Sequence, residues 1–476
     1  MLETKTSPTS NSDFPVYKTF WSLYLLMGLQ SLAYAGFTVL VVPLSLMMWP
    51  DEPYHALEIG ILIAVLFWVS SISGLFFGML IDKYSRKKII FLISLFRSMS
   101  IFMLGFAIVG QGFETWFYFL FFVGFFGVFA GGSFPSIISI SNDIVPKDTR
   151  SRFFGALGIS ISLFMTVGFL VASLFVQYGF WREYFWGLGI SILVAGLLFT
   201  IHMDEPKRGA QEEELVNILK DDDIEYDFQI DREMMKKTMF SKTNIVALVE
   251  GISSNILMGA IVVLILPYIQ TPPHNISPVA TSIFLIVFGF TAGLAGQIVF
   301  GALSDKLCKD HPIRRIYFMI ISIALGFLTF ILIFFIPLPH LTVAEGENIP
   351  YLFSLPIIWI FGILFFASNM ISVIFWINQA PILQEINLPE AQGKITSWNQ
   401  LVENIGWGLG ALIVGILLVM SNSNYQLTII LLTFFIIPGI LVWFFAIKWY
   451  PDDSKQVRKI LEERAKILES RKNNNK

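Results

Sequence analysis

The fold of this chain is decided by the stretch Gly78-Met79-Leu80-Ile81-Asp82-Lys83-Tyr84-Ser85-Arg86-Lys87-Lys88. It lies between two apolar runs, residues 57–81 and 89–109. Each run is long enough to cross the roughly 30 Å hydrocarbon layer of a bilayer as a helix. Four cations fall within the six positions 83–88. Because cytoplasmic loops of membrane proteins are rich in Lys and Arg, the stretch is expected at the cytoplasmic face.

The composition is typical of a membrane protein. Of the 476 residues, 55% are hydrophobic and only 14% are charged. A water-soluble surface needs more charged groups than this. The single cysteine, Cys308, excludes an intrachain disulfide. With a net charge of −3 and no basic surface, nucleic acid is not an expected partner.

Twelve apolar runs are expected to form spanning helices. They cover residues 17–48, 57–81, 88–109, 115–141, 152–177, 183–202, 242–270, 278–303, 313–337, 351–379, 394–420 and 425–449. If both termini are cytoplasmic, 30 of the 32 Lys and Arg residues fall in cytoplasmic segments. The sequence therefore predicts an all-α, multi-pass protein of the cell membrane with both termini in the cytoplasm.

The chain repeats itself. Gly78 and Gly301 are 223 positions apart, as are Asp82 and Asp305. Such a repeat predicts two pseudo-symmetric six-helix bundles. The expected segments are a disordered cytoplasmic tail at 1–16, a first bundle at 17–202, a cytoplasmic linker at 203–241, a second bundle at 242–449 and a cytoplasmic tail at 450–476.

Two motifs resemble those of the major facilitator superfamily. The stretch 78–88 fills every position of its G-x-x-x-D-[R/K]-x-[G/S]-R-[R/K]-x loop, and residues 143–150, DIVPKDTR, match its D-x-x-P-x-x-x-R loop. The resemblance implies twelve helices around a midplane cavity and transport by alternating access. The residues to which it gives a gating role are Gly78, Asp82, Lys83, Arg86, Lys87, Asp143, Arg150, Gly301 and Asp305.

The resemblance also implies an ionic latch. Asp82, Arg86 and Asp143 could pair at the inner ends of spans two and four and hold the cytoplasmic gate closed in the outward-open state. The alternative is that each charge anchors its own loop. From the residues alone, Gly78 is expected to allow close approach of two helices, and Asp82 to cap the next helix or pair with Arg86.

A narrower likeness is to spinster-like transporters. It rests on DKYSRKK at 82–88, on EPKRG at 205–209, and on Gly127 followed by Pro135 and Asp143. Those proteins commonly carry an acid in span four where this chain has Ala130, so the likeness supplies no proton site in the first half. It favours a lipid-like cargo.

Two acids, Glu250 and Glu403, are expected near the midplane of spans seven and eleven. A carboxyl group in such an apolar site takes up a proton readily, as proton coupling requires. A structural hydrogen-bonded carboxyl is the alternative. Arg97 in span three is expected to be structural, pairing inward with a carbonyl or an acid. Polar or aromatic residues expected to line the cavity are Gln30, Tyr34, Asn255, Asn369, Trp376, Asn399 and Gln400.

The sequence thus predicts a secondary active transporter, not an enzyme, for a small organic solute that is amphiphilic, lipid-like or drug-like. The coupling ion is expected to be the proton, and no metal or cofactor is expected. The chain is expected to act in the lipid bilayer as a monomer. A carrier of a small polar metabolite or sugar is the alternative within transporters. A non-transporting membrane receptor on the same scaffold is the alternative from another class.

Overall fold

The computed structural model describes residues 15–145, 149–205, 234–235 and 238–474. Every regular element in these ranges is helical. The first half contains α1 (Val16–Val39), α2 (Val41–Met48), α3 (Ala56–Lys83), α4 (Arg86–Leu104), α5 (Phe113–Ala130), α6 (Ser133–Ile144), α7 (Arg150–Gln177) and α8 (Trp181–His202). The second half contains α11 (Lys242–Gln270), α12 (Pro278–Phe284), the π-helix η3 (Leu285–Phe290), α13 (Thr291–Cys308), α14 (Arg314–Ile333), α15 (Val343–Glu347), α16 (Ile349–Ser354), α17 (Pro356–Glu385), α18 (Pro389–Met420) and α19 (Tyr425–Asn474).

These helices form twelve crossings, because α1 and α2, α5 and α6, and α12, η3 and α13 each follow one another within a single span. In the described ranges, eleven of the crossings are long and apolar enough to traverse a membrane. The other one is α4, in which 4 of 19 residues are Arg or Lys. A helix satisfies its own backbone hydrogen bonds, which is why apolar runs of this length fold as helices in lipid.

The two halves repeat one packing pattern, which confirms the predicted pair of pseudo-symmetric bundles. In the first half α1 packs on α7, α3 on α5 and α4 on α8. The corresponding pairs of the second half are α11 with α18, α13 with α17 and α14 with α19.

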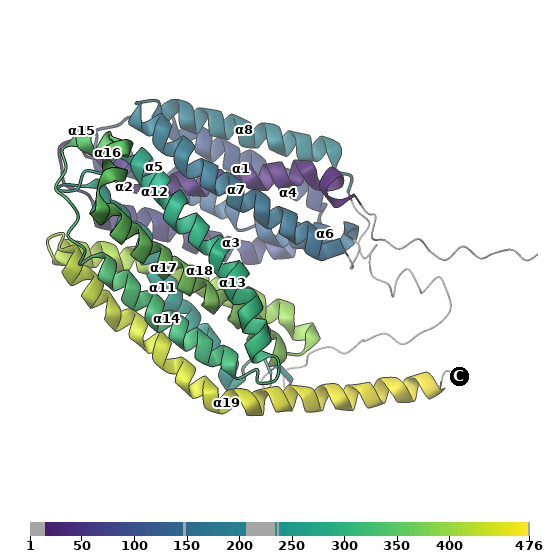
Figure 1. Cartoon of the computed structure of the whole chain (residues 1–476). Coiled ribbons are helices and arrows are strands. Elements are labelled where there is room, and N and C mark those ends of the chain that lie inside the picture. Colours follow the sequence, from purple (N-terminus) through teal and green to yellow (C-terminus); the bar gives the residue numbers. More distant parts are fainter. Residues whose placement is uncertain (1–14, 146–148, 206–233, 236–237, 475–476) are drawn as a thin grey trace, which may run out of the picture.

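The halves contact each other at one end and part at the other (Figure 1). The contact consists of α3 against α18 and α7 against α12. On α3 it extends from Ala56, whose oxygen would lie 2.7 Å from a Cβ added at Gly415, to Ser71, whose hydroxyl donates to the Leu401 oxygen at 3.5 Å. Between them, a Cβ added at Gly60 would lie 2.5 Å from the Ala411 oxygen. Nearer the basic loop, Phe76 of α3 is 59% exposed and Trp398 of α18 is 53% exposed.

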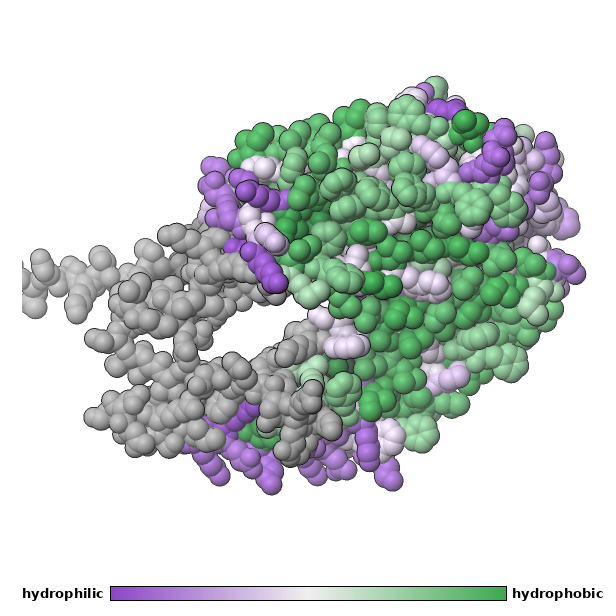
Figure 2. All heavy atoms as spheres, turned by 180° about the vertical axis from the view of Figure 1, so that it is seen from behind, coloured by the Kyte–Doolittle hydropathy of each residue, from purple (hydrophilic) through white to green (hydrophobic). Residues whose placement is uncertain are grey.

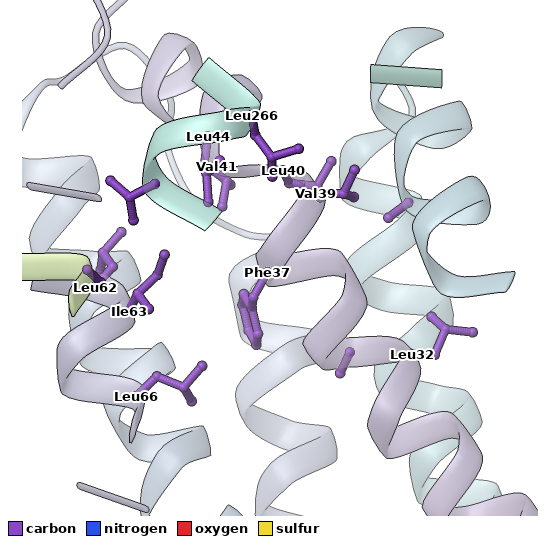
Figure 3. Close-up of a cluster of buried hydrophobic side chains, with 14 of the residues drawn as sticks. Leu32, Phe37, Val39, Leu40, Val41, Leu44, Leu62, Ile63, Leu66 and Leu266 are labelled. Atoms are coloured by element: carbon purple, nitrogen blue, oxygen red, sulfur yellow. The ribbon is translucent and has the colours of Figure 1, made fainter. Parts of the chain in front are cut away.

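Apolar side chains from both halves close the contacting end. Figure 3 shows Leu62 and Leu66 of α3 and Phe37 of α1 in one cluster with Leu266 of α11. All four side chains are buried. On the outer surface of the protein, hydrophobic residues cover most of the face shown in Figure 2. This is expected of a surface in contact with lipid.

Span four is interrupted at Gly131 and Gly132. A Cβ at Gly131 would lie 2.7 Å from the backbone nitrogen of Gly74 on α3, so only glycine fits this crossing. The interruption is where α6 begins, at Ser133.

The last helix continues past residue 449, where the final span was expected to end. It is one continuous helix from Tyr425 to Asn474 that contains Pro438 and Pro451 and bends along its length (Figure 1). Its outer part is fixed to the end of α17, since Ser454 donates to Glu385 Oε1 at 3.1 Å, and Tyr450 and Arg458 also donate to that carboxylate.

Candidate functional site

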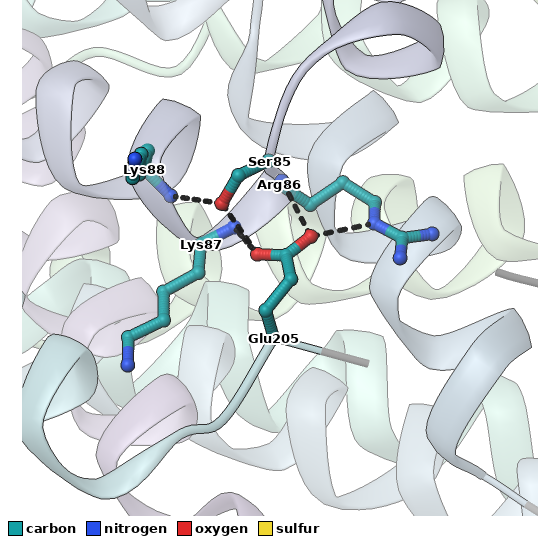
Figure 4. Close-up of polar contacts among 5 residues, drawn as sticks. All are labelled: Ser85, Arg86, Lys87, Lys88 and Glu205. Carbon is teal, nitrogen blue, oxygen red and sulfur yellow. Dashed lines mark hydrogen bonds and ion pairs between the residues drawn. The ribbon is translucent and has the colours of Figure 1, made fainter. Parts of the chain in front are cut away.

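Glu205 binds the first turn of α4 at the end of the molecule that carries the basic loop (Figure 4). Its Oε1 accepts from the Arg86 backbone N–H at 2.9 Å and from Arg86 Nε at 3.3 Å. Its Oε2 accepts from the Lys87 backbone N–H at 2.9 Å and from the Ser85 hydroxyl at 2.6 Å. Ser85 in turn accepts from the Lys88 N–H at 3.3 Å. Glu205 and Ser85 thus act together as the cap of α4.

The environment of Glu205 favours its ionised form. Partial burial alone would raise its pKa, but hydrogen bonds from Ser85, Lys87 and Arg86 together lower the pKa below the usual value. The negative charge complements the positive end of the helix dipole. Because Glu205 follows α8, this contact joins the start of span three to the end of span six.

The predicted latch involves Asp82 and Asp143, whose side chains, like that of Arg150, lie outside the described residues. It stays a prediction. Arg86 is buried and bonded to Glu205, and Lys83 is exposed in the last turn of α3.

The close approach expected at Gly78 is wrong for this conformation. No atom lies within 4 Å of a Cβ added at Gly78, and the same holds at Gly301. Both glycines lie towards the ends of helices that part there. The close contact is made one turn earlier, where a Cβ added at Gly74 would lie 3.2 Å from the Gly131 oxygen.

The second copy of the loop motif contains one charge pair. Arg315 Nη2 lies 3.0 Å from Asp305 Oδ1, and Arg315 Nη1 donates to Asn378 Oδ1 at 3.1 Å. Asn378 Nδ2 donates to the Ser304 hydroxyl at 3.1 Å. One arginine therefore joins α13, α14 and α17.

Glu250 lies in the interior of the second half and is 0% exposed. Its Oε1 accepts a hydrogen bond from Ser254, one turn further along α11. The indole of Trp443 on α19 faces the carboxyl group, but neither Trp443 Nε1 nor Glu250 Oε2 has a partner of good hydrogen-bond geometry in the described ranges. Ser253, three residues after Glu250, donates to the Phe435 oxygen at 2.8 Å.

Glu403 is the second acid of the interior and lies on α18. Asn399 Nδ2 donates to its Oε1 at 2.5 Å, and the buried Gln379 of α17 faces the same carboxyl group. A Cβ added at Gly251 would lie 3.6 Å from Glu403 Cγ and 3.6 Å from Asn399 Oδ1. Because Gly251 adjoins Glu250, the two acids lie at one level on adjacent helices, and their charges interact.

We call Glu250 and Glu403 the acidic pair. Within the described ranges neither has a Lys or Arg partner at ion-pair distance. An isolated carboxylate is costly in an apolar interior, so a bound proton is the least costly way to remove its charge. Two neighbouring acids add mutual repulsion to that cost. Chemically, the acidic pair can bind and release protons. No group of three His, Cys, Asp or Glu side chains in the same ranges could hold a metal ion.

Arg97 lies in the interior of the first half, and its partners are an amide and a hydroxyl, whereas the sequence suggested a carbonyl or an acid. Its Nη1 donates to Gln30 Oε1 and, at 2.9 Å, to the Ser133 hydroxyl. The guanidinium carbon lies 4.4 Å from the ring centre of Phe126 and 5.6 Å from that of Tyr34. We call these five residues the arginine cluster.

The other expected cavity residues are dispersed. Asn255 and Asn369 each donate to the backbone oxygen one turn earlier in their own helix, Asn255 at 2.8 Å and Asn369 at 2.8 Å. Trp376 and Ser254 help to line a small pocket, about 30 Å³ in volume, between α11, α14 and α17. Gln400 is exposed where the halves part.

Sequence reasoning missed three contributors. From the sequence, Glu205 had no role beyond the spinster-like likeness. A lone acid before proline at the end of a span could nevertheless have indicated a helix-capping residue. Gln379 and Trp443 gave no signal, because their proximity to the acidic pair depends on how α17 and α19 pack against α11 and α18.

Comparison with known proteins gives a consistent result. Residues 26–380 and 251–474 match the family model of the Major Facilitator Superfamily. The fold is similar to that of a bacterial homolog of the human lysosomal transporter Spinster in its inward-facing, unoccupied conformation, at TM-score 0.71 and 15% identity, covering 93% of this chain and 99% of that one.

Two further solved structures share the fold. The nucleoside transporter NupG matches at TM-score 0.63 and 13% identity, over 90% of this chain and 99% of its own. The peptide transporter POT matches at TM-score 0.61 and 16% identity, over 92% and 95%.

Proposed function

The chain belongs to the Major Facilitator Superfamily, and we propose that it is a secondary active transporter that moves a small, amphiphilic organic solute by alternating access coupled to protons. One observation carries the proposal. The halves contact each other at one end only, and Glu403 lies at the limit of that contact, two residues from Leu401, which accepts the last hydrogen bond from α3. Rocking of the halves about this level would expose a midplane site to each side in turn.

The moving bodies in this proposal are residues 17–202 and 242–449, joined by a cytoplasmic linker at 203–241. The basic-loop end is cytoplasmic, so the described conformation is inward-facing. The distribution of Lys and Arg supports this orientation. Epitope tags inserted in the 203–241 segment and at the C-terminus should be accessible from the same side of the membrane. Accessibility from opposite sides would contradict the orientation.

Protons are the proposed coupling ion because the acidic pair is buried without a cation. Protonation of Glu403 removes a charge next to the contact between the halves, and deprotonation restores it. If burying the ionised Glu403 costs more free energy in one conformation than in the other, proton binding and release favour different conformations and so couple to rocking. Glu250 would share the proton through its proximity to Glu403.

An amphiphilic cargo is proposed from the character of the walls. The pocket beside Ser254 is lined mainly by apolar and aromatic side chains, among them Phe327, Phe375 and Trp376. The fold alone does not select a cargo, since similar structures carry the names of nucleoside and peptide transporters.

Uptake into proteoliposomes tests the proposal. Solute panels are screened with a trapped pH dye and with an imposed pH step, with and without an uncoupler. We expect solute-dependent proton movement in the wild type and in the control Glu347→Gln, which alters an exposed acid of α15. Glu403→Gln should abolish that proton movement. Uptake that ignores both the pH step and the uncoupler would contradict proton coupling.

A further inference from the structure

We propose that Arg97 binds an anionic group of the transported solute, a carboxylate or a phosphate. This inference rests on the proposed transport function and adds the charge of the cargo to it. The binding group would be the guanidinium itself, held in place by Gln30 and Ser133.

Arg97 is only 1% exposed and is incompletely bonded. Nη1 donates to the Gln30 and Ser133 oxygens. Nε and Nη2 have no hydrogen-bond partner in the described part of the chain. No carboxylate of that part lies within ion-pair distance of the guanidinium.

The two unpartnered nitrogens form one edge of the guanidinium group. Nε–H and Nη2–H point in the same direction and are spaced to meet both oxygens of a carboxylate or phosphate. The aromatic rings of Phe126 and Tyr34 lie near the cation, but a ring offers only a weak acceptor compared with an anionic oxygen. The free edge therefore has the geometry of a bidentate anion site.

A purely structural arginine would have its donors satisfied. Burial of a cation with two unbonded N–H groups is costly in an apolar interior. A negatively charged ligand removes that cost when it binds. Tyr34 and Ser133 are only half-buried, so these two members of the cluster lie at accessible surface, whereas Arg97 Nε and Nη2 themselves are buried.

The second half supplies the complementary chemistry. The acidic pair can carry protons, and a solute anion that travels with a proton adds no net charge to the interior. The arginine cluster lies in one half and the acidic pair in the other. The first half would therefore bind the solute anion and the second half the proton.

The experiment uses the full chain reconstituted in lipid nanodiscs and measures its thermal unfolding with three water-soluble aromatic probes. Naphthalene-2-carboxylate and 2-naphthyl phosphate carry the two candidate anionic groups on the same ring system, and naphthalene-2-carboxamide is the neutral match of the first. We expect at least one anion to raise the unfolding temperature and the amide not to do so. The stronger of the two anions identifies the group.

Three variants assign the effect to the site. Arg97→Gln should weaken anion binding about tenfold or more, since a charge-assisted bidentate contact is lost. Gln30→Glu gives Arg97 the acidic partner that it lacks, so it should keep or raise the stability of the unliganded protein and still abolish the anion-dependent shift. Arg182→Gln, at the start of α8, is the matched control and should bind as the wild type does.

The Gln30→Glu variant separates the two roles, because a structural arginine would gain stability there with no loss of ligand binding. The inference is wrong if no anion stabilises the wild type, if the amide acts as well as the carboxylate, or if Gln30→Glu leaves the shift intact. Failure of the transport proposal has a different signature, namely Arg97-dependent anion binding without any flux in proteoliposomes.

Discussion

Trp68 of the first half donates its indole hydrogen to the backbone oxygen of Ile405 in the second half at 3.1 Å. This bond lies two residues from Glu403 along α18. The interior acid and the contact between the halves therefore share one helical turn. A change in the charge of Glu403 acts on the same segment that must separate from α3 when the contacting end opens.

The crossing at Gly60 should be sensitive to any added side chain. Gly60→Val would place atoms against the Ala411 oxygen, 2.5 Å from the ideal Cβ. Overpacking of this kind costs about 1–3 kcal/mol, which corresponds to roughly 5- to 150-fold in the population of the closed end. We expect uptake to fall by a similar factor.

Thiol labelling checks that the closed end has opened. In a Cys308→Ser background, Ile63→Cys is buried in the closed end and should react slowly, and addition of Gly60→Val should make it reactive. Gly187→Val is the control, because no atom lies within 4 Å of a Cβ there. Unchanged labelling and uptake with Gly60→Val would contradict the role of this crossing.

Because Glu205 caps α4 as a carboxylate, the folded protein should lose stability when the pH is lowered enough to protonate it. Its pKa is lowered in the folded state from the usual 4.5, so the ionised carboxylate stabilises the fold above that value, and the stabilisation is lost as the pH falls through the lowered pKa. Glu205→Gln should cost about 1 kcal/mol at pH 7. The difference in unfolding temperature between wild type and variant should shrink as the pH approaches 3, and a constant difference would show that charge is not involved.

Asp305 and Arg315 should contribute unequally although they form a pair. Asp305 is 79% exposed, so Asp305→Ala should change the free energy of unfolding by less than about 0.5 kcal/mol. Arg315→Ala also removes the donor to the buried Asn378 and should cost about 1–3 kcal/mol. Chemical or thermal unfolding in detergent measures both, and equal effects would argue against the shared network.

Replacing Glu250 by Gln should have little effect on stability, whereas replacing it by Ala should destabilise the protein. Glu250→Gln keeps an acceptor for Ser254 and should change stability by less than about 1 kcal/mol while removing the proton. Glu250→Ala should cost about 2–5 kcal/mol through the cavity and the lost acceptor. If Gln proves as disruptive as Ala, the ionised carboxylate itself stabilises the fold, and Glu250 is then no proton carrier.

Much of the fold followed from the sequence because its signals are local and strong. Apolar length gives each span, and the repeat of Gly78 and Asp82 at Gly301 and Asp305 gives the two halves. The close approach expected at Gly78 is wrong because the neighbouring helix is met one turn earlier, at Gly74, which a loop motif at the end of the span cannot reveal. The partners of Arg97 could not be read from spacing, since Gln30, Phe126 and Ser133 reach it from other helices.

The unbroken helix from Tyr425 to Asn474 has a practical consequence for watching this protein work. Because Ser454 of α19 is bonded to Glu385 of α17, the end of α19 should turn together with the second half. A fluorophore near residue 472, paired with an acceptor on the opposite lobe, would therefore magnify small angular displacements into large changes in energy transfer.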